Sequence, residues 1–138
     1  MEQDEQLEAV KKKIGIGHIQ RHVFLCLGPK CCEPEVGEAS WELLKKKLKD
    51  AGLSSGDHVC QRTRVGCLRI CCHGPTMLVY PEGTWYHGMT PDRIPRFVQE
   101  HLIDGKPIEE WIFARNPLSA FSGEPQATAA APSPSAPR

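Results

Sequence analysis

The stretch that decides the fold reads CCHGPTMLVYPEGTWYH, residues 71–87. It holds two runs rich in apolar, β-branched and aromatic side chains, 76–80 and 84–87, on either side of Pro81-Glu82-Gly83. Proline and glycine favour tight turns, and short apolar runs flanking such a turn are typical of a β-hairpin. We therefore expect two antiparallel strands here, directly after a pair of adjacent cysteines.

Two more strands are predicted upstream of the hairpin. Residues 22–25 form a short apolar run, and residues 58–65 alternate their side chains with the period of two that a strand requires. The first run ends at Cys26, and the second ends just before Cys67. Both strands are therefore expected to lead into loops that carry cysteines.

Two amphipathic helices are predicted beside the strands. Over residues 38–50, Trp41, Leu44 and Leu48 recur at helical spacing while lysines occupy the opposite face. Residues 90–102 show a second apolar face after a threonine that suits an N-cap and a proline at the first helical position. The predicted order is β-α-β-β-β-α, an α/β fold with a small mixed sheet and flanking helices.

The ends of the chain differ from its middle. Residues 1–17 are highly charged and are expected to form a frayed helix or a disordered arm, while residues 122–138 are rich in Ala, Pro and Ser and are expected to be a disordered tail. The domain is predicted to span residues 18–121. The apolar segment 107–118 is expected to pack back on this domain or against a partner chain.

The bulk composition argues against several classes of function. Lys plus Arg total 17 and Asp plus Glu total 17, so no net charge favours nucleic acid or an anionic membrane surface. No run approaches the roughly 20 apolar residues that span a bilayer, and the acidic N-terminus does not resemble a secretory signal. We therefore expect a cytoplasmic protein that neither inserts into membranes nor binds nucleic acid.

The seven cysteines are the main functional signal. In a reducing compartment, clustered cysteines more often bind metal or react than form disulfides. Six of them lie in two loops, Cys26-Leu27-Gly28-Pro29-Lys30-Cys31-Cys32 and Cys67-Leu68-Arg69-Ile70-Cys71-Cys72. If the preceding strands run the same way, both loops meet at one edge of the sheet. Four thiolates could then converge there, two from each loop, as a [2Fe–2S] cluster requires.

These residues carry a family resemblance. The gap of four residues in the first cysteine pair, the gap of three in the second, and Gly74-Pro75 followed by the hairpin are similar to the thioredoxin-like [2Fe–2S] ferredoxins. The resemblance extends over about residues 22–113. It implies a thioredoxin-like fold, a single [2Fe–2S] cluster and a one-electron carrier, not an enzyme, that exchanges electrons with redox partner proteins and commonly forms a homodimer.

Carried over by position, the resemblance implies the cluster ligands Cys26, Cys31, Cys67 and Cys71. Two residues separate Cys71 from the Gly-Pro pair, as in the family. Cys32 stays an alternative to Cys31, because the two are adjacent and the family varies in the length of this loop. Cys60, in the middle of a predicted strand, is expected to be a buried apolar side chain, and Cys32 and Cys72 are expected to pack near the cluster.

Two other interpretations stay open. The same chemistry would suit an electron-transfer subunit of a larger oxidoreductase complex. A different class, a structural Cys₄ zinc-binding interaction module, would also use four thiolates, although zinc sites usually space their pairs by two residues. The intervening residues 68–70 are expected to be exposed and to contact a partner.

The six histidines show no paired metal-binding spacing. His73 lies in the second cysteine loop and could donate a hydrogen bond near a sulfur. The others are scattered at strand and helix ends and are expected to be solvated: His18, His22, His58, His87 and His101.

Overall fold

The computed structural model describes residues 2–118. Its sheet has five strands in the order β2-β1-β3-β4-β5. Their bounds are Ile19–Cys26 for β1, Val59–Val65 for β2, Met77–Tyr80 for β3, Thr84–Tyr86 for β4 and Ile112–Arg115 for β5. β1 pairs in parallel with β2, and every other neighbouring pair is antiparallel. The predicted α/β fold with a small mixed sheet and flanking helices is confirmed.

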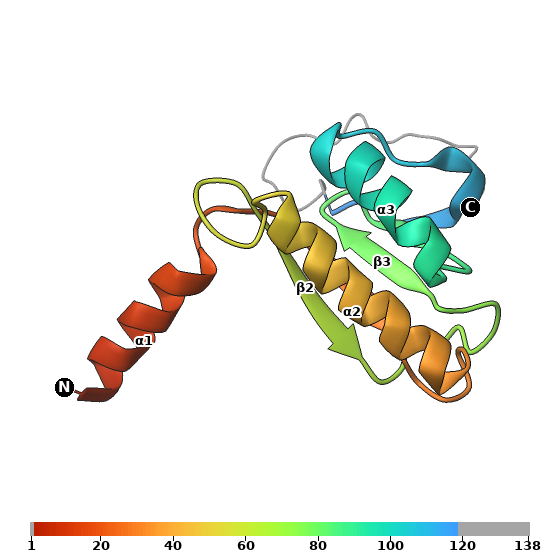
Figure 1. Ribbon diagram of the computed structural model, residues 1–138, viewed down its shortest axis with the longest axis horizontal. Coiled ribbons are helices and arrows are strands. Elements are labelled where there is room, and N and C mark those ends of the chain that lie inside the picture. Colours follow the sequence, from red (N-terminus) through yellow and green to blue (C-terminus); the bar gives the residue numbers. More distant parts are fainter. Residues whose placement is uncertain (1, 119–138) are drawn as a thin grey trace.

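The helices lie on one side of this sheet. Figure 1 shows α2 and α3 side by side over the same face, while α1 projects away from the body. The bounds are Glu2–Ile14 for α1, Pro34–Asp50 for α2, Pro91–Arg93 for η1, Ile94–Phe97 for α3, Val98–Ile103 for η2 and Glu109–Trp111 for η3. In the part of the chain that the structure describes, no helix is both long and apolar enough to span a membrane.

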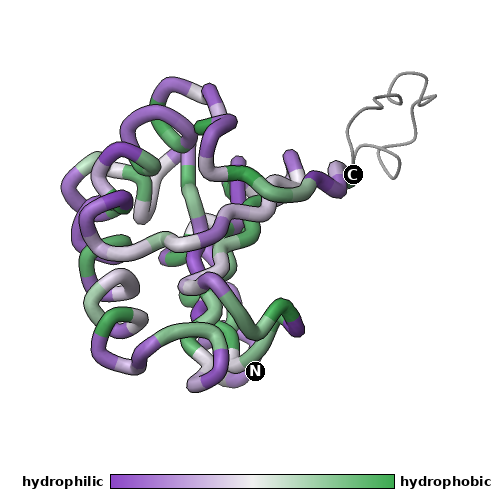
Figure 2. Tube along the Cα trace, turned by 90° about the vertical axis from the view of Figure 1, so that its right-hand side faces the viewer, coloured by the Kyte–Doolittle hydropathy of each residue, from purple (hydrophilic) through white to green (hydrophobic). Residues whose placement is uncertain are grey.

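The core lies between the helices and one sheet face. Val23 and Leu25 of β1 are fully buried and meet the predicted stripe of α2, in which Leu44 and Leu48 are also fully buried. In Figure 2 the helical turns alternate between hydrophilic and hydrophobic colours, as expected for helices with one buried face. Cys60 lies in this core, so its predicted role as a buried apolar side chain is confirmed.

Two segments differ in detail from the sequence prediction. The second predicted helix is a continuous run, but it starts as a 3₁₀ turn and ends as a π-helix, η2. Pro91 and Pro95 have no N–H to donate, which weakens α-helical bonding in the first turns. The segment 107–118 packs back on the domain, as one of the two predicted alternatives, and supplies a strand that the predicted order lacked: β5 pairs with β4 at the sheet edge.

The described residues do not test where the predicted domain begins and ends. The charged N-terminal segment forms α1, with exposed side chains along most of its length. Residues 119–138, which include the predicted tail and the predicted end of the domain, lie outside the described residues. The domain limits at 18 and 121 therefore stay predictions.

Strand direction brings the two cysteine loops together. β1 and β2 are parallel and in register at their ends, with Cys26 opposite Val65. β3 runs the other way and starts at this same edge, since Leu25 pairs with Met77. The loop after β1, the loop after β2 and the entry into β3 are therefore neighbours, as the sequence predicted.

Candidate metal centre

A cavity of about 200 Å³ lies between the two cysteine loops. It is lined by Cys26, Gly28, Pro29, Lys30, Cys31, Gly66, Cys67 and Cys71. All four predicted ligands line this cavity, whereas Cys32 and Cys72 do not. Their assignment as ligands stays a prediction, but the fold gathers these four thiols around one space.

Glycines allow the two loops to touch through their main chains. A Cβ placed on Gly28 would lie 2.1 Å from the carbonyl oxygen of Gly66, which is closer than atoms can approach. A Cβ on Gly74 would lie 2.3 Å from both the oxygen and the sulfur of Cys31. Glycine is required at both positions because only a residue without a side chain fits such contacts. Cys31 is therefore enclosed by the segment that precedes β3.

The second loop has an unusual backbone. Arg69, Cys71 and His73 have φ angles of 71°, 59° and 53°, in the left-handed region that non-glycine residues rarely adopt. Alternation of such residues with ordinary ones turns successive N–H groups toward one side and creates an anion-binding concavity. The Arg69 N–H donates to the Cys67 sulfur at 3.2 Å. The left-handed conformation of Arg69 thus accompanies one backbone donor aimed at a sulfur.

The four thiols form two unequal pairs. Cys26 and Cys31 are 2% and 6% exposed, whereas Cys67 and Cys71 are exposed, with their sulfurs 4.0 Å apart. Within residues 2–118, no three His, Cys, Asp or Glu side chains converge closely enough to hold a single metal ion. Two separate pairs match the demand of a cluster with two irons, each bound by two thiolates.

The electrostatics of the site favour a bound cation. Burial raises the pKa of the Cys26 thiol, although the N–H groups of Gly28 and Leu68 donate to its sulfur. The hydrogen bond with Cys67, together with burial and the charge of that neighbour, raises the pKa of the Cys71 thiol. Several thiolates cannot ionise side by side unless a cation compensates their charge. A metal centre supplies that charge and keeps its thiols deprotonated, so these residues fit a thiolate-bound cluster.

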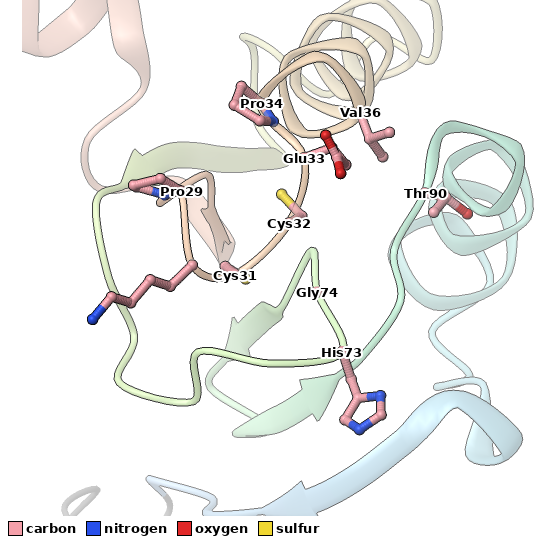
Figure 3. A pocket seen from close by; sticks show the side chains of 10 residues that line it. Pro29, Cys31, Cys32, Glu33, Pro34, Val36, His73, Gly74 and Thr90 are labelled. Carbon is pink, nitrogen blue, oxygen red and sulfur yellow. The ribbon is translucent and has the colours of Figure 1, made fainter.

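Cys32 faces a different environment from Cys31. Its sulfur packs against Gly37 in the first turns of α2, and Figure 3 shows it beside Glu33 and Pro34. Burial, reinforced by the nearby Cys31 and Cys26 thiols, raises the pKa of Cys32 to about 11. Cys31 and Cys32 both line a pocket of about 550 Å³ on the outer side of the loop, but only Cys31 of the two also lines the cavity between the loops. The geometry therefore favours Cys31 over Cys32 for the cavity between the loops.

Cys72 and the histidines do not line the cavity between the loops. Cys72 is exposed and lines a separate pocket of about 460 Å³ with Ile70, His73, His87 and Phe113. The prediction that His101 is solvated is wrong: it is fully buried, and its Nδ1 lies 2.7 Å from the hydroxyl of Tyr86. The spacing of His101 from Phe97 and Val98 on the apolar helix face was a signal that could have revealed this.

Together, the fold and the paired thiols define a class, namely small α/β proteins with a thiolate metal centre at one sheet edge. No family model matches the chain. It is 27% identical over 103 residues to a 2Fe-2S ferredoxin of Aquifex aeolicus, covering 69% of this chain and 90% of that protein. It is 32% identical over 91 residues to a Priestia megaterium protein described as "Putative 2Fe-2S ferredoxin", covering 66% of this chain and 68% of that one.

A solved structure gives the same result for the fold. The wild-type thioredoxin-like [2Fe–2S] ferredoxin from Aquifex aeolicus superposes with a TM-score of 0.61 at 26% identity, covering 68% of this chain and 96% of that one. The chain belongs to the thioredoxin-like [2Fe–2S] ferredoxin family. The family predicted from the cysteine spacing and the hairpin is therefore confirmed.

Proposed function

We propose that this protein is a one-electron carrier that holds a single [2Fe–2S] cluster between its two cysteine loops. The ligands in this proposal are Cys26, Cys31, Cys67 and Cys71. The observation that carries it is the one cavity that all four thiols line and that their neighbours Cys32 and Cys72 do not. Family membership confirms the predicted cofactor and the predicted carrier role, and the ligand assignment is our own proposal.

When bound, the cluster supplies a centre that accepts and releases a single electron. The chain holds it from both sides, with a buried pair of thiols on one loop and an exposed pair on the other. The N–H groups of Gly28, Leu68 and Arg69 donate to ligand sulfurs and offset the negative charge that reduction adds. We propose that the protein catalyses no reaction itself and that any catalysis belongs to its redox partners.

The exposed loop is the proposed contact for those partners. Arg69 is exposed, and Leu68 and Ile70 are half-buried, between the two exposed thiols. Electron transfer falls steeply with distance, so a partner gains most by docking where the centre is least covered. This loop meets that condition, whereas Cys26 and Cys31 lie behind it in the fold.

We also propose a homodimer that forms through the sheet face opposite α2 and α3. This face carries aromatic contacts: His22 stacks on Phe24 with ring centroids 4.3 Å apart, and Trp85 meets Phe113 at 6.3 Å. Phe113 is 43% exposed. Aromatic side chains are enriched at the centre of protein interfaces, and exposed aromatic rings on one sheet face can pack against the same face of a second copy. Sedimentation equilibrium should give a dimer, and Phe113→Glu should give a monomer.

The proposed location is the cytoplasm. All seven cysteines are free thiols in the structure. Free, clustered thiols fit a reducing compartment. Secretion of the protein with these cysteines paired as disulfides would contradict the proposal.

A visible absorption spectrum of freshly purified protein tests the proposed function. We expect broad bands that bleach with dithionite, with iron and acid-labile sulfide in equal amounts. A colourless protein that contains zinc but neither iron nor sulfide would overturn the proposal and favour the zinc-binding module.

A further inference from the structure

Thr76 is a buried polar residue that contacts both cysteines of the buried pair. Its side chain is fully buried, immediately before β3. Its carbonyl oxygen accepts the Cys26 N–H at 2.9 Å, and its own N–H donates to the Cys31 sulfur at 3.4 Å. Its hydroxyl oxygen lies 3.6 Å from that same sulfur. One residue thus fixes the backbone of Cys26 and the side chain of Cys31.

The direction of the hydroxyl contact depends on the state of Cys31. A protonated thiol can donate to the threonine oxygen, but a thiolate has no proton, so the hydroxyl must then be the donor. Among the hydrogen bonds of residues 2–118, the Cys31 sulfur is the partner of this hydroxyl, so no other acceptor competes for it. A hydroxyl can rotate to make this change without moving the backbone.

The other proposed ligands have no equivalent. Cys26 accepts two backbone N–H groups and contacts the Cys31 thiol. Cys67 accepts one backbone N–H group and contacts the Cys71 thiol. Thr76 is the residue within 2–118 whose side-chain hydroxyl lies within hydrogen-bond distance of one of the four sulfurs. Because Thr76 is fully buried, its contact with Cys31 lies in a low-dielectric environment, where a hydrogen bond is electrostatically stronger than in water.

We propose that the Thr76 hydroxyl donates a hydrogen bond to the Cys31 thiolate and thereby raises the reduction potential of the cluster. This inference rests on the proposed function. Reduction adds one electron from a donor protein to the cluster and its sulfurs, and no bond breaks and no proton moves. A donor aimed at a sulfur stabilises the reduced form more than the oxidised form because the reduced form carries the extra negative charge.

The same contact distinguishes Cys31 from Cys32. The Cys31 sulfur receives the N–H of Thr76 and faces its hydroxyl, whereas the Cys32 sulfur receives the N–H of Gly37 in α2. Thr76 is therefore a positioning residue. It holds the Cys31 side chain toward the cavity from a place 45 residues away in the sequence.

The test is a redox titration of the full-length, cluster-loaded protein with three substitutions. Thr76→Val keeps the shape of the side chain but removes the hydroxyl, and Thr76→Ser restores it. Thr84→Val is the matched control, because Thr84 is also buried but its hydroxyl has no hydrogen-bond partner within residues 2–118. At a fixed ambient potential, we expect Thr76→Val to lower the ratio of reduced to oxidised cluster about three- to tenfold, where tenfold equals 59 mV for one electron.

Thr76→Ser and Thr84→Val should keep the wild-type ratio. Thr76→Val with a wild-type potential would overturn the inference, and so would Thr76→Ser shifted as far as Thr76→Val. If Thr76→Val does not fold, as judged by circular dichroism, Thr76→Ala takes its place with the same expectation. A coloured wild-type protein with unchanged variants refutes only the role of Thr76, whereas a colourless wild-type protein refutes the proposed function itself.

Discussion

The two ends of strand β3 both gather polar groups into the protein interior, but they do so in opposite ways. At the start of the strand, Thr76 and the cysteine loops direct thiols and N–H donors toward a cavity. At the other end, beyond Tyr80, the side chains of Arg21, Glu82, Tyr86 and His101 contact one another. The first end is open to an additional group, and the second is closed on itself.

The contacts at the closed end join side chains from several elements. The Ile108 N–H donates to the Tyr86 oxygen at 3.1 Å, and the Tyr86 hydroxyl shares a hydrogen bond with Nδ1 of His101 at 2.7 Å, in which the tautomer of His101 sets the donor. Nε2 of His101 lies 3.5 Å from the Glu82 carboxylate, and it has no hydrogen-bond partner among residues 2–118. Arg21 donates to that carboxylate at 2.7 Å.

The difference indicates which end serves function and which serves stability. The side chains at the closed end contact one another, and removing one leaves its buried partners unpaired. Thiolates around a cavity repel one another and need a cation to compensate their charge. Removal of a thiol at the open end should therefore affect the cluster and spare the fold, and removal of a charged partner at the closed end should do the reverse.

The largest expected effect is at the cysteines. Serine at Cys26, Cys31, Cys67 or Cys71 should abolish or alter the visible bands, because each change removes a thiolate from the cavity. Serine at Cys32, Cys60 or Cys72 should leave the bands in place. Visible absorption and iron content of the purified variants check this series. Intact bands in Cys31→Ser together with lost bands in Cys32→Ser would show that the second ligand is Cys32.

At the closed end, Glu82→Gln should reduce stability and leave the cluster spectrum unchanged. The substitution leaves the partly buried Arg21 and the buried His101 without their anionic acceptor, which should cost about 2–3 kcal/mol. Denaturant unfolding of wild type and variant measures the difference. Glu109→Gln is the control, because its ion pair with Arg115 is exposed and should contribute less than about 1 kcal/mol. Equal effects of the two substitutions would contradict the importance of the closed network.

A steric change at the open end should affect both properties. Gly28→Ala places a Cβ against the Gly66 carbonyl and must separate the loops, which should cost about 1–3 kcal/mol and reduce the yield of bound cluster. Gly66→Ala is a matched control, since a Cβ there meets no atom within 4 Å. Iron content and unfolding free energy are the measurements. Normal cluster yield in Gly28→Ala would show that the loops do not need this contact.

The smallest effect is a dependence on pH at the closed end. Burial raises the pKa of Glu82, but hydrogen bonds from His101 and Arg21 outweigh it and lower the pKa to about 2. Because the folded pKa lies below the unfolded one, this stabilisation is present above about pH 4.5 and is lost as the pH falls toward 2. With the carboxylate about a quarter exposed, we expect a loss of about 1–2 kcal/mol.

Unfolding free energies of wild type and Glu82→Gln should therefore converge between pH 4.5 and pH 2. The exposed carboxylates contribute equally to both proteins and cancel in the difference. A difference that stays constant across this range would show that Glu82 is not the group that titrates.

Local patterns predicted most of the fold. The period of two in 58–65, the stripe of Trp41, Leu44 and Leu48, and the Pro-Gly turn of the hairpin are all set by neighbours in sequence. β5 was missed because Ile112–Arg115 is a short run whose strand form depends on pairing with β4. The burial of His101 was missed because its partners, Tyr86 and Glu82, lie on other elements.

The candidate site was predictable in position but not in detail. β1 ends at Cys26 and β2 ends at Val65, just before Cys67, so their parallel direction alone places both loops at one edge of the sheet. The choice between Cys31 and Cys32 could not follow from spacing, because the contacts that separate them come from Thr76 and Gly37. Arg69 and His73 adopt left-handed backbone conformations although they are not glycines. The sequence therefore does not indicate these conformations or the path of their loop.

The main-chain contact between Gly28 and Gly66 has a consequence for how such proteins diverge and can be redesigned. The separation of the two loops is set by contact between their main chains, so it does not depend on which side chains surround the site. Lys30 beside the first pair and Arg69 within the second can be exchanged to change the charge presented to a partner. Partner preference and sulfur geometry are therefore separable, and one can be engineered while the other is left intact.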